Sequence, residues 1–149
     1  MEVRRSGLKA WPAVGILLMQ ALLLLAHWFI YHTWIVFWPL GPAAALELRV
    51  ALLLLAFSFI VAALLSFRFS NPLVSFIYKI AAVWLGFLNY FFWAACLSWM
   101  VWFMLPLCGL HSNPAHIRPL IAGVLFTLAV LVCIYGGLMV HILRSAALI

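Results

Sequence analysis

The chain of 149 residues is 70% hydrophobic and only 7% charged, with a mean hydropathy of +1.30. Charged residues fill about a quarter of the positions of a soluble domain, so this composition excludes a soluble globular fold and predicts an all-α integral membrane protein. The formal net charge of +6 does not indicate nucleic-acid binding. The basic residues instead flank apolar segments, where they orient a protein in the bilayer.

Residues 1–10 form a basic flank ahead of the first predicted span, which covers about residues 12–38. A cleaved signal peptide has an apolar core of only about 7–15 residues, so we expect this longer segment to be retained. Gln20, His27 and Tyr31 share one helical face within it. Hydrogen bonds to another helix are the favoured interpretation of this face. A haem ligand or a proton-relay histidine is the alternative, because ionisable groups inside a membrane are functional candidates.

The second predicted span, about residues 48–67, carries no recognisable chemistry. The third, about residues 73–105, is rich in aromatic residues and contains Lys79, Gly86 and Asn89, which fall on one stripe of small and polar residues. Such stripes pack helices together in lipid, so we expect this helix to form the centre of a bundle with the stripe facing its neighbours. Lys79 is interpreted as extending its ammonium group to the lipid headgroups, with a substrate or ion site as the alternative.

The fourth predicted span covers about residues 120–140, after an expected irregular loop at 107–119. The loop contains His111 and His116, but a histidine pair that binds metal on a helix is spaced i,i+4, and no carboxylate lies nearby. No metal or cofactor site is therefore predicted. Residues 11–149 are predicted to form a single four-transmembrane-helix bundle.

The distribution of basic residues predicts the orientation. With the N-terminus in the cytoplasm, six of the eight basic residues lie inside and two, Arg49 and Arg118, lie outside. Basic residues are enriched on the cytoplasmic side of membrane proteins. We therefore expect a multi-pass protein of the cell inner (plasma) membrane with both termini in the cytoplasm.

Short motifs in the second half of the chain resemble the N-terminal transmembrane domain of bacterial membrane-anchored metallophosphoesterases. The similarity extends roughly from Asn71 to Gly137. Its motifs are Asn71-Pro72-Leu73, Ile77-Tyr78-Lys79, Trp84-Leu85-Gly86-Phe87-Leu88, Tyr90-Phe91 and Ile134-Tyr135-Gly136. The first two spans agree with this family only in general character.

The resemblance implies an enzyme that hydrolyses phosphate esters at two divalent metal ions held by a C-terminal catalytic domain. The family's metal ligands include aspartates, and this chain has no aspartate, so no catalytic or metal residue is carried over. The implied function is that of a membrane anchor or scaffold without a catalytic site. A truncated gene product and a stand-alone relative both fit this interpretation.

A different class of function stays open as the alternative. Gln20, His27, Lys79 and Asn89 are polar residues inside predicted spans, which is typical of a small ligand-binding membrane subunit. Such a subunit would carry haem for electron transfer or assist a transporter. The expected partners are the lipid bilayer and either a C-terminal catalytic domain or a partner membrane subunit.

Overall fold

The computed structural model describes residues 7–68, 71–108 and 113–146. Within these ranges the chain forms four helices, namely α1 (Gly7–Phe37), α2 (Pro42–Arg68), α3 (Pro72–Leu107) and α4 (Pro114–Ala146). All four are long and apolar enough to cross a membrane. The predicted all-α class with four helices of membrane-spanning length is therefore confirmed.

Proline begins three of the helices, at Pro42, Pro72 and Pro114. The first N–H groups of a helix have no acceptor within it, so proline loses nothing there and its fixed φ favours the helical turn. The second helix begins at Pro42, ahead of the span predicted from about residue 48. The fourth begins at Pro114, so the prediction of an irregular loop over residues 107–119 is wrong for its last part.

Asparagine caps two of these helices. The side chain of Asn71 accepts a hydrogen bond from the backbone N–H of Leu73 at 3.4 Å, and that of Asn113 accepts one from Ala115 at 3.1 Å. An asparagine cap satisfies one of the N–H groups that the helix leaves unpaired. Each Asn-Pro pair thus combines a cap with a favourable first residue, and both pairs mark the start of a helix.

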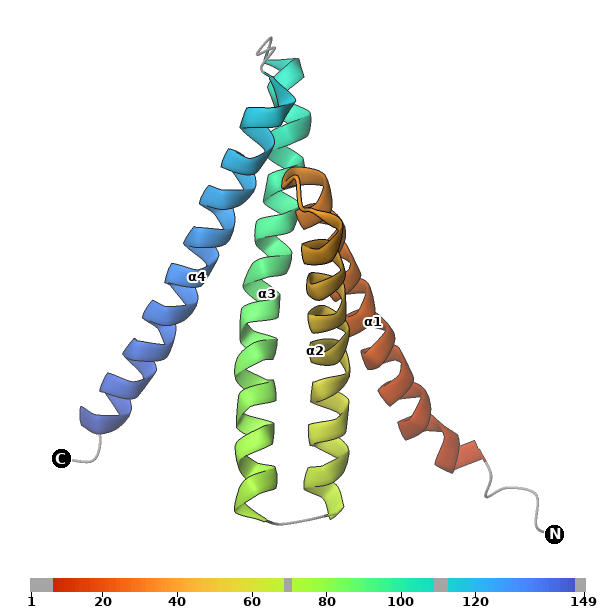
Figure 1. Cartoon of the computed structure of the whole chain (residues 1–149). Helices are drawn as coiled ribbons and strands as arrows, with labels where there is room; N and C mark the ends of the chain where they lie inside the picture. The colour runs from red at the N-terminus through yellow and green to blue at the C-terminus, as the bar shows by residue number, and fades with distance from the viewer. Residues whose placement is uncertain (1–6, 69–70, 109–112, 147–149) are drawn as a thin grey trace.

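The helices run alternately up and down, as in an antiparallel bundle (Figure 1). The start of α1, the end of α2, the start of α3 and the end of α4 lie at the same end of the molecule. Within the described ranges α1 and α3 each contact the other three helices, whereas α2 and α4 do not touch one another. Toward the end that holds the termini, α1 and α4 diverge from the central pair.

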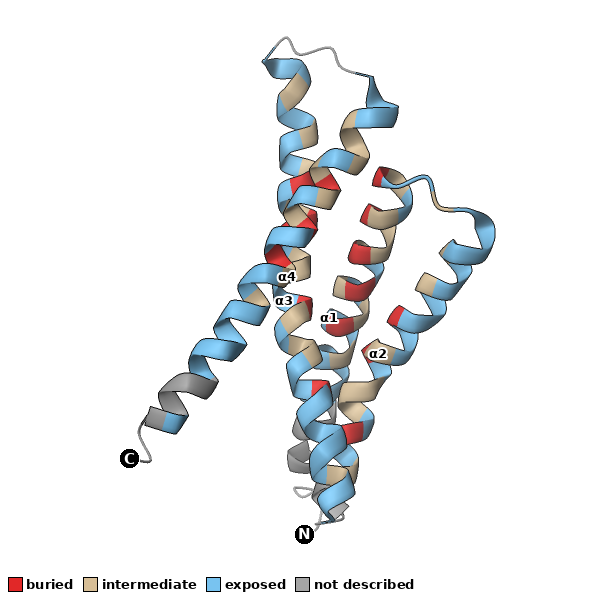
Figure 2. Ribbon diagram, turned by 60° about the vertical axis from the view of Figure 1, so that its left-hand side comes forward, coloured by how far each residue is buried: buried red, intermediate tan, exposed pale blue. Residues whose placement is uncertain are grey.

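Buried residues are sparse and lie on the inner sides of the helices (Figure 2). Aromatic rings fill much of the core. Phe37 is 1% exposed and packs edge-on against Trp99, and Trp34 packs edge-on against Phe126 of α4 with centroids 5.1 Å apart. From residue 131 to residue 140, α4 has no buried residue.

The buried face of α3 is the opposite of the predicted one. The buried residues of this helix are Ala81, Leu88, Ala94, Ala95 and Ser98. Lys79, Gly86 and Asn89 are exposed, and a Cβ added at Gly86 would meet no atom within 4 Å. The prediction that this stripe packs inside the bundle is therefore wrong for this chain. The buried residues Ala81 and Leu88 lie two positions after the exposed Lys79 and Gly86. At 3.6 residues per turn, two positions correspond to a rotation of roughly 200° about the helix axis.

Replacing Ala95 with leucine should destabilise the bundle, because this residue is 0% exposed and its neighbours leave no room for a larger side chain. Overpacking of this kind costs about 1–3 kcal/mol. Thermal unfolding of the detergent-solubilised protein, followed by circular dichroism, measures the effect. Ala82→Leu on the exposed side of the same helix is the matched control, and an equal loss in both variants would contradict the assigned face.

Candidate functional site

His27 is held between α1 and α3 by two hydrogen bonds. Its ring is 3% exposed, its Nδ1 lies 2.7 Å from the carbonyl oxygen of Leu23, and the indole Nε1 of Trp84 donates to its Nε2 at 3.0 Å. Because Nε2 accepts, the proton of the neutral ring resides on Nδ1 and is donated to Leu23. The bond from Trp84 to His27 is of the interhelical kind that the sequence favours for this face of the helix. A haem iron at His27 would have to displace Trp84.

Thr33 repeats this arrangement further along α1. Its side chain is fully buried, its hydroxyl donates to the carbonyl oxygen of Phe29 at 2.9 Å, and it accepts the indole N–H of Trp99 at 3.0 Å. In both places an indole of α3 donates to a side chain of α1, whose own proton bonds to the carbonyl four residues back. No polar hydrogen of these pairs is left unsatisfied, which matters because an unpaired buried donor is costly.

Gln20 joins α1 to α2 rather than to α3. Its Nε2 donates to the backbone carbonyl of Ala56 at 3.1 Å. Its Oε1 is buried and has no hydrogen-bond partner in the described part of the chain. The residue borders a pocket of about 330 Å³ whose other lining residues are apolar. Gln20 therefore contributes one hydrogen bond to packing and leaves one acceptor available.

The structure does not bring the predicted polar residues into one site. Gln20 lies between α1 and α2, and His27 lies between α1 and α3, whereas Lys79 is on the exposed side of α3. Asn89 is also exposed and borders a pocket of about 380 Å³ between α1 and α3 that is otherwise apolar. Lys79 and Asn89 make no hydrogen bond or ion pair with any described residue.

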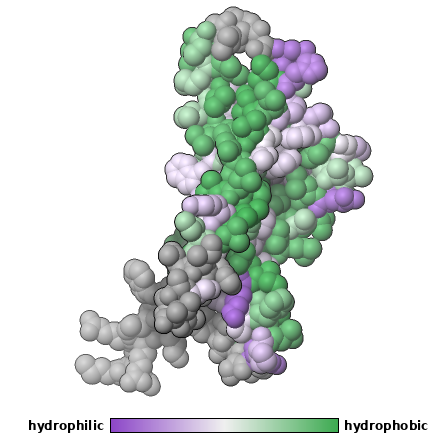
Figure 3. Space-filling model, turned by 90° about the vertical axis from the view of Figure 1, so that its left-hand side faces the viewer, coloured by the Kyte–Doolittle hydropathy of each residue, from purple (hydrophilic) through white to green (hydrophobic). Residues whose placement is uncertain are grey.

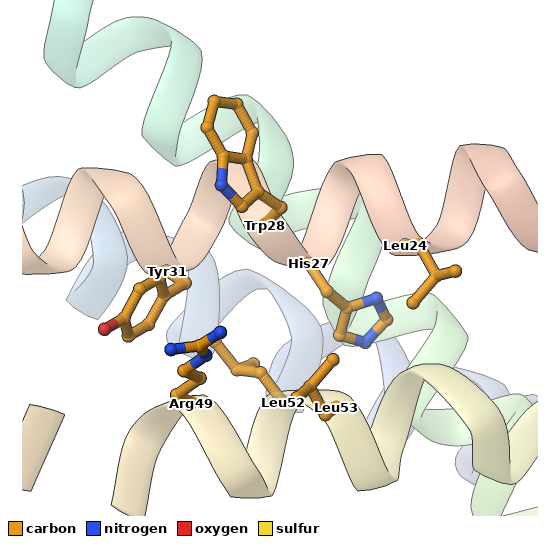
Figure 4. A pocket seen from close by; sticks show the side chains of 7 residues that line it. All are labelled: Leu24, His27, Trp28, Tyr31, Arg49, Leu52 and Leu53. Carbon is orange, nitrogen blue, oxygen red and sulfur yellow. The ribbon is translucent and has the colours of Figure 1, made fainter. Parts of the chain in front are cut away.

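A pocket between α1 and α2 gathers polar groups that sequence reasoning did not connect (Figure 4). It has a volume of about 350 Å³ and is lined by Leu24, His27, Trp28, Tyr31, Arg49, Leu52 and Leu53. In Figure 4 the side chains of Tyr31 and Arg49 lie at the same end of the pocket. Apolar pockets with a few convergent polar groups are the usual form of a small-molecule site.

Three further contacts of aromatic rings lie near the same end of the bundle. The ring of His32 is stacked between Trp28 and Trp99, with centroids 5.4 Å and 5.9 Å away and planes 12° and 5° apart. The guanidinium of Arg118 lies 4.2 Å from the ring centroid of Trp102. That distance is within the range of a cation–π interaction, so Arg118 already has a partner inside the protein.

No group of three or more histidine, cysteine, aspartate or glutamate side chains gathers among the residues that the structure describes. Of the two loop histidines considered in the sequence, His116 is exposed at the start of α4, and His111 lies outside the described residues. The cysteines Cys96, Cys108 and Cys133 are all free. The described residues thus offer no preformed metal centre.

Comparison of the chain with protein-family models, with curated proteins and with solved structures gave no significant match. The resemblance to the membrane domain of metallophosphoesterases therefore stays a prediction from the quoted motifs.

Replacing Trp84 or Trp99 with phenylalanine should lower the free energy of unfolding, because each change removes an indole donor and keeps most of the ring volume. Hydrogen bonds between helices in lipid contribute about 0.6–1.7 kcal/mol. Trp93→Phe is the control, since Trp93 is 59% exposed and its indole makes no hydrogen bond with a described residue. Titration of the detergent-solubilised variants with dodecyl sulfate measures the free energy of unfolding of all three. Equal stability of the Trp84 and Trp99 variants and the Trp93 control would refute the role of these hydrogen bonds.

Proposed function

We propose that this protein is a membrane-embedded helical anchor or scaffold. Support comes first from its surface, where large apolar side chains such as Leu17, Leu54 and Leu120 are 66–68% exposed. On the face that Figure 3 shows, hydrophobic side chains cover much of the described surface, and the most hydrophilic ones lie at separate points. Exposed apolar patches of more than a few hundred Å² mark membrane or protein contacts, and helices of this length suit a hydrocarbon core about 30 Å thick.

The main support for an anchor is that the buried polar side chains form hydrogen bonds within and between helices. His27 and Thr33 each accept an indole N–H from α3 and donate to their own helix, and the amide of Gln20 donates to α2. A catalytic base or metal ligand needs a nitrogen or oxygen that can reach a substrate. In the described chain these groups hold helices together instead, as expected for a structural domain.

We propose further that the chain corresponds to the membrane domain that precedes the catalytic part of bacterial metallophosphoesterases. The support is the motif that contains Trp84, whose indole joins α3 to α1 through His27. A motif residue that packs two helices together is expected in a membrane domain that anchors a separate catalytic domain. The bilayer is the proposed partner, in the cell inner membrane with both termini in the cytoplasm, and an additional catalytic domain or membrane subunit is the second proposed partner.

The purified 149-residue chain should not hydrolyse a general phosphatase substrate such as p-nitrophenyl phosphate, even with added Mn²⁺, because it has no aspartate for a two-metal centre. A colorimetric assay of detergent-solubilised protein tests this, with a known two-metal phosphatase in the same detergent as the positive control. Metal-dependent hydrolysis that scales with the concentration of pure protein would contradict an anchor without catalytic chemistry.

Fusions after Ile149 should report a cytoplasmic C-terminus when the protein is expressed in a bacterial host. Green fluorescent protein fused there is expected to fluoresce, and alkaline phosphatase fused there is expected to be inactive, because that enzyme matures only outside the cytoplasm. A fusion within the connection at Gly41, between α1 and α2, should give the reverse result. Active phosphatase at the C-terminus would refute the orientation, and release of the protein by alkaline carbonate would refute membrane insertion.

A further inference from the structure

The pocket between α1 and α2 is polar at one end and apolar at the other. Because α1 runs toward the α1–α2 connection and α2 runs away from it, Tyr31 and Arg49 are the lining residues nearest that connection. Leu24 and Leu53 lie farthest from it, about 10 Å deeper than Tyr31 on α1 and about 6 Å deeper than Arg49 on α2, at a rise of 1.5 Å per residue. A pocket with a cation and a hydroxyl at one end and leucine side chains at the other suits an amphiphile with an anionic head and an apolar tail.

The charge of Arg49 is uncompensated within the described residues. The sequence has two acidic residues, Glu2 and Glu47. Glu2 lies outside the described part, and Glu47 makes no ion pair with Arg49. The hydroxyl of Tyr31 likewise makes no hydrogen bond with a described residue. A guanidinium presents several N–H donors that suit the oxygens of a phosphate, and a neighbouring phenol can add another.

The depth of Arg49 on α2 suits a lipid phosphate. This helix ends at Arg68, and the two arginines are separated by about 28 Å along the helix axis at 1.5 Å per residue. That length is close to the roughly 30 Å thickness of the hydrocarbon core of a bilayer. An α2 that spans the membrane would therefore place Arg49 at one headgroup layer and Arg68 at the other.

The pocket is also accessible from the side of the bundle. Two of its lining residues, Trp28 and Leu53, are 58% and 43% exposed on the outer surface. A lipid can thus enter laterally without separation of the helices. A volume of about 350 Å³ is large enough for a phosphoglycerol group and the first methylenes, and the rest of an acyl chain would lie along the exposed leucines of α1 and α2.

We propose that this pocket binds one anionic phospholipid, with its phosphate on Arg49 and Tyr31 and an acyl chain directed toward Leu24 and Leu53. The proposal rests on the proposed insertion of the protein in a membrane. Phosphatidylglycerol and phosphatidylcholine are suitable probes, because they share the phosphate and differ in net charge.

The experiment measures lipid retained by the full chain. Wild-type protein is expressed, incorporated into membranes with equal amounts of the two lipids, extracted into mild detergent and analysed by native mass spectrometry. We expect one retained phosphatidylglycerol, favoured over phosphatidylcholine. Arg49→Gln should lower its retention by roughly tenfold, which corresponds to about 1.4 kcal/mol. Arg49→Lys should restore most of it, and Tyr31→Phe should weaken it less than Arg49→Gln does.

Arg118→Gln is the matched control, because Arg118 lies near the start of α4 and its guanidinium is already engaged by Trp102. It should retain phosphatidylglycerol like the wild type, whereas equal losses in both variants would show attraction to general positive charge and overturn the site. Equal retention of the two lipids would overturn the preference for an anion, and release of the lipid by millimolar inorganic phosphate or by a fatty acid would assign the pocket to that ligand instead.

Membrane insertion is checked separately on the same samples by extraction with alkaline carbonate. Protein that stays in the membrane but shows no selective retention overturns the lipid site and leaves the proposed anchor function intact. Protein that leaves the membrane overturns both. Circular dichroism of each variant confirms that its helix content matches the wild type before its lipids are compared.

Discussion

The indole N–H groups that α3 donates to α1 determine how this bundle is assembled. Trp84 binds His27 and Trp99 binds Thr33, and each acceptor is buried among apolar side chains. Trp84 and Trp99 are half-buried, and each hydrogen bond between helices in lipid contributes about 0.6–1.7 kcal/mol, so rotation of α3 about its axis would lose both contributions. These two bonds therefore fix which side of α3 faces inward, and the aromatic contacts of Phe37 and Trp99 follow from that choice.

The existence of four long helices could be predicted from length and hydropathy, because a run of about 20 apolar residues has few other stable forms. The helix boundaries were harder to predict for a specific reason. Proline disfavours the interior of a helix and favours its first turn, so Pro42 and Pro114 are compatible with both an ending and a beginning. The preceding Asn113, a capping residue, was the local signal that α4 starts there.

The inward face of α3 could not be predicted from its own sequence. This helix has two stripes, one of small and polar residues that includes Gly86 and Asn89, and one of alanine and aromatic residues that includes Trp84. Both are common at helix interfaces in lipid, and the partners on the neighbouring helices decide between them. His27 and Trp84 are 57 residues apart, and Thr33 and Trp99 are 66 residues apart, so the deciding contacts depend on a register that periodicity does not contain. The same holds for the placement of Tyr31 and Arg49 in one pocket.

His27 connects the packing of the bundle to its pocket. Trp84 and Leu23 hold its ring from the α3 side and from α1 itself, while the same ring forms part of the wall that faces α2. A side chain with both nitrogens engaged cannot easily turn into the pocket, so that wall keeps its shape whether or not a ligand is present. Preorganised walls lower the entropy that binding must overcome. The hydrogen bonds between α1 and α3 thus act on α2 as well, because they preserve the pocket that Arg49 and Tyr31 line.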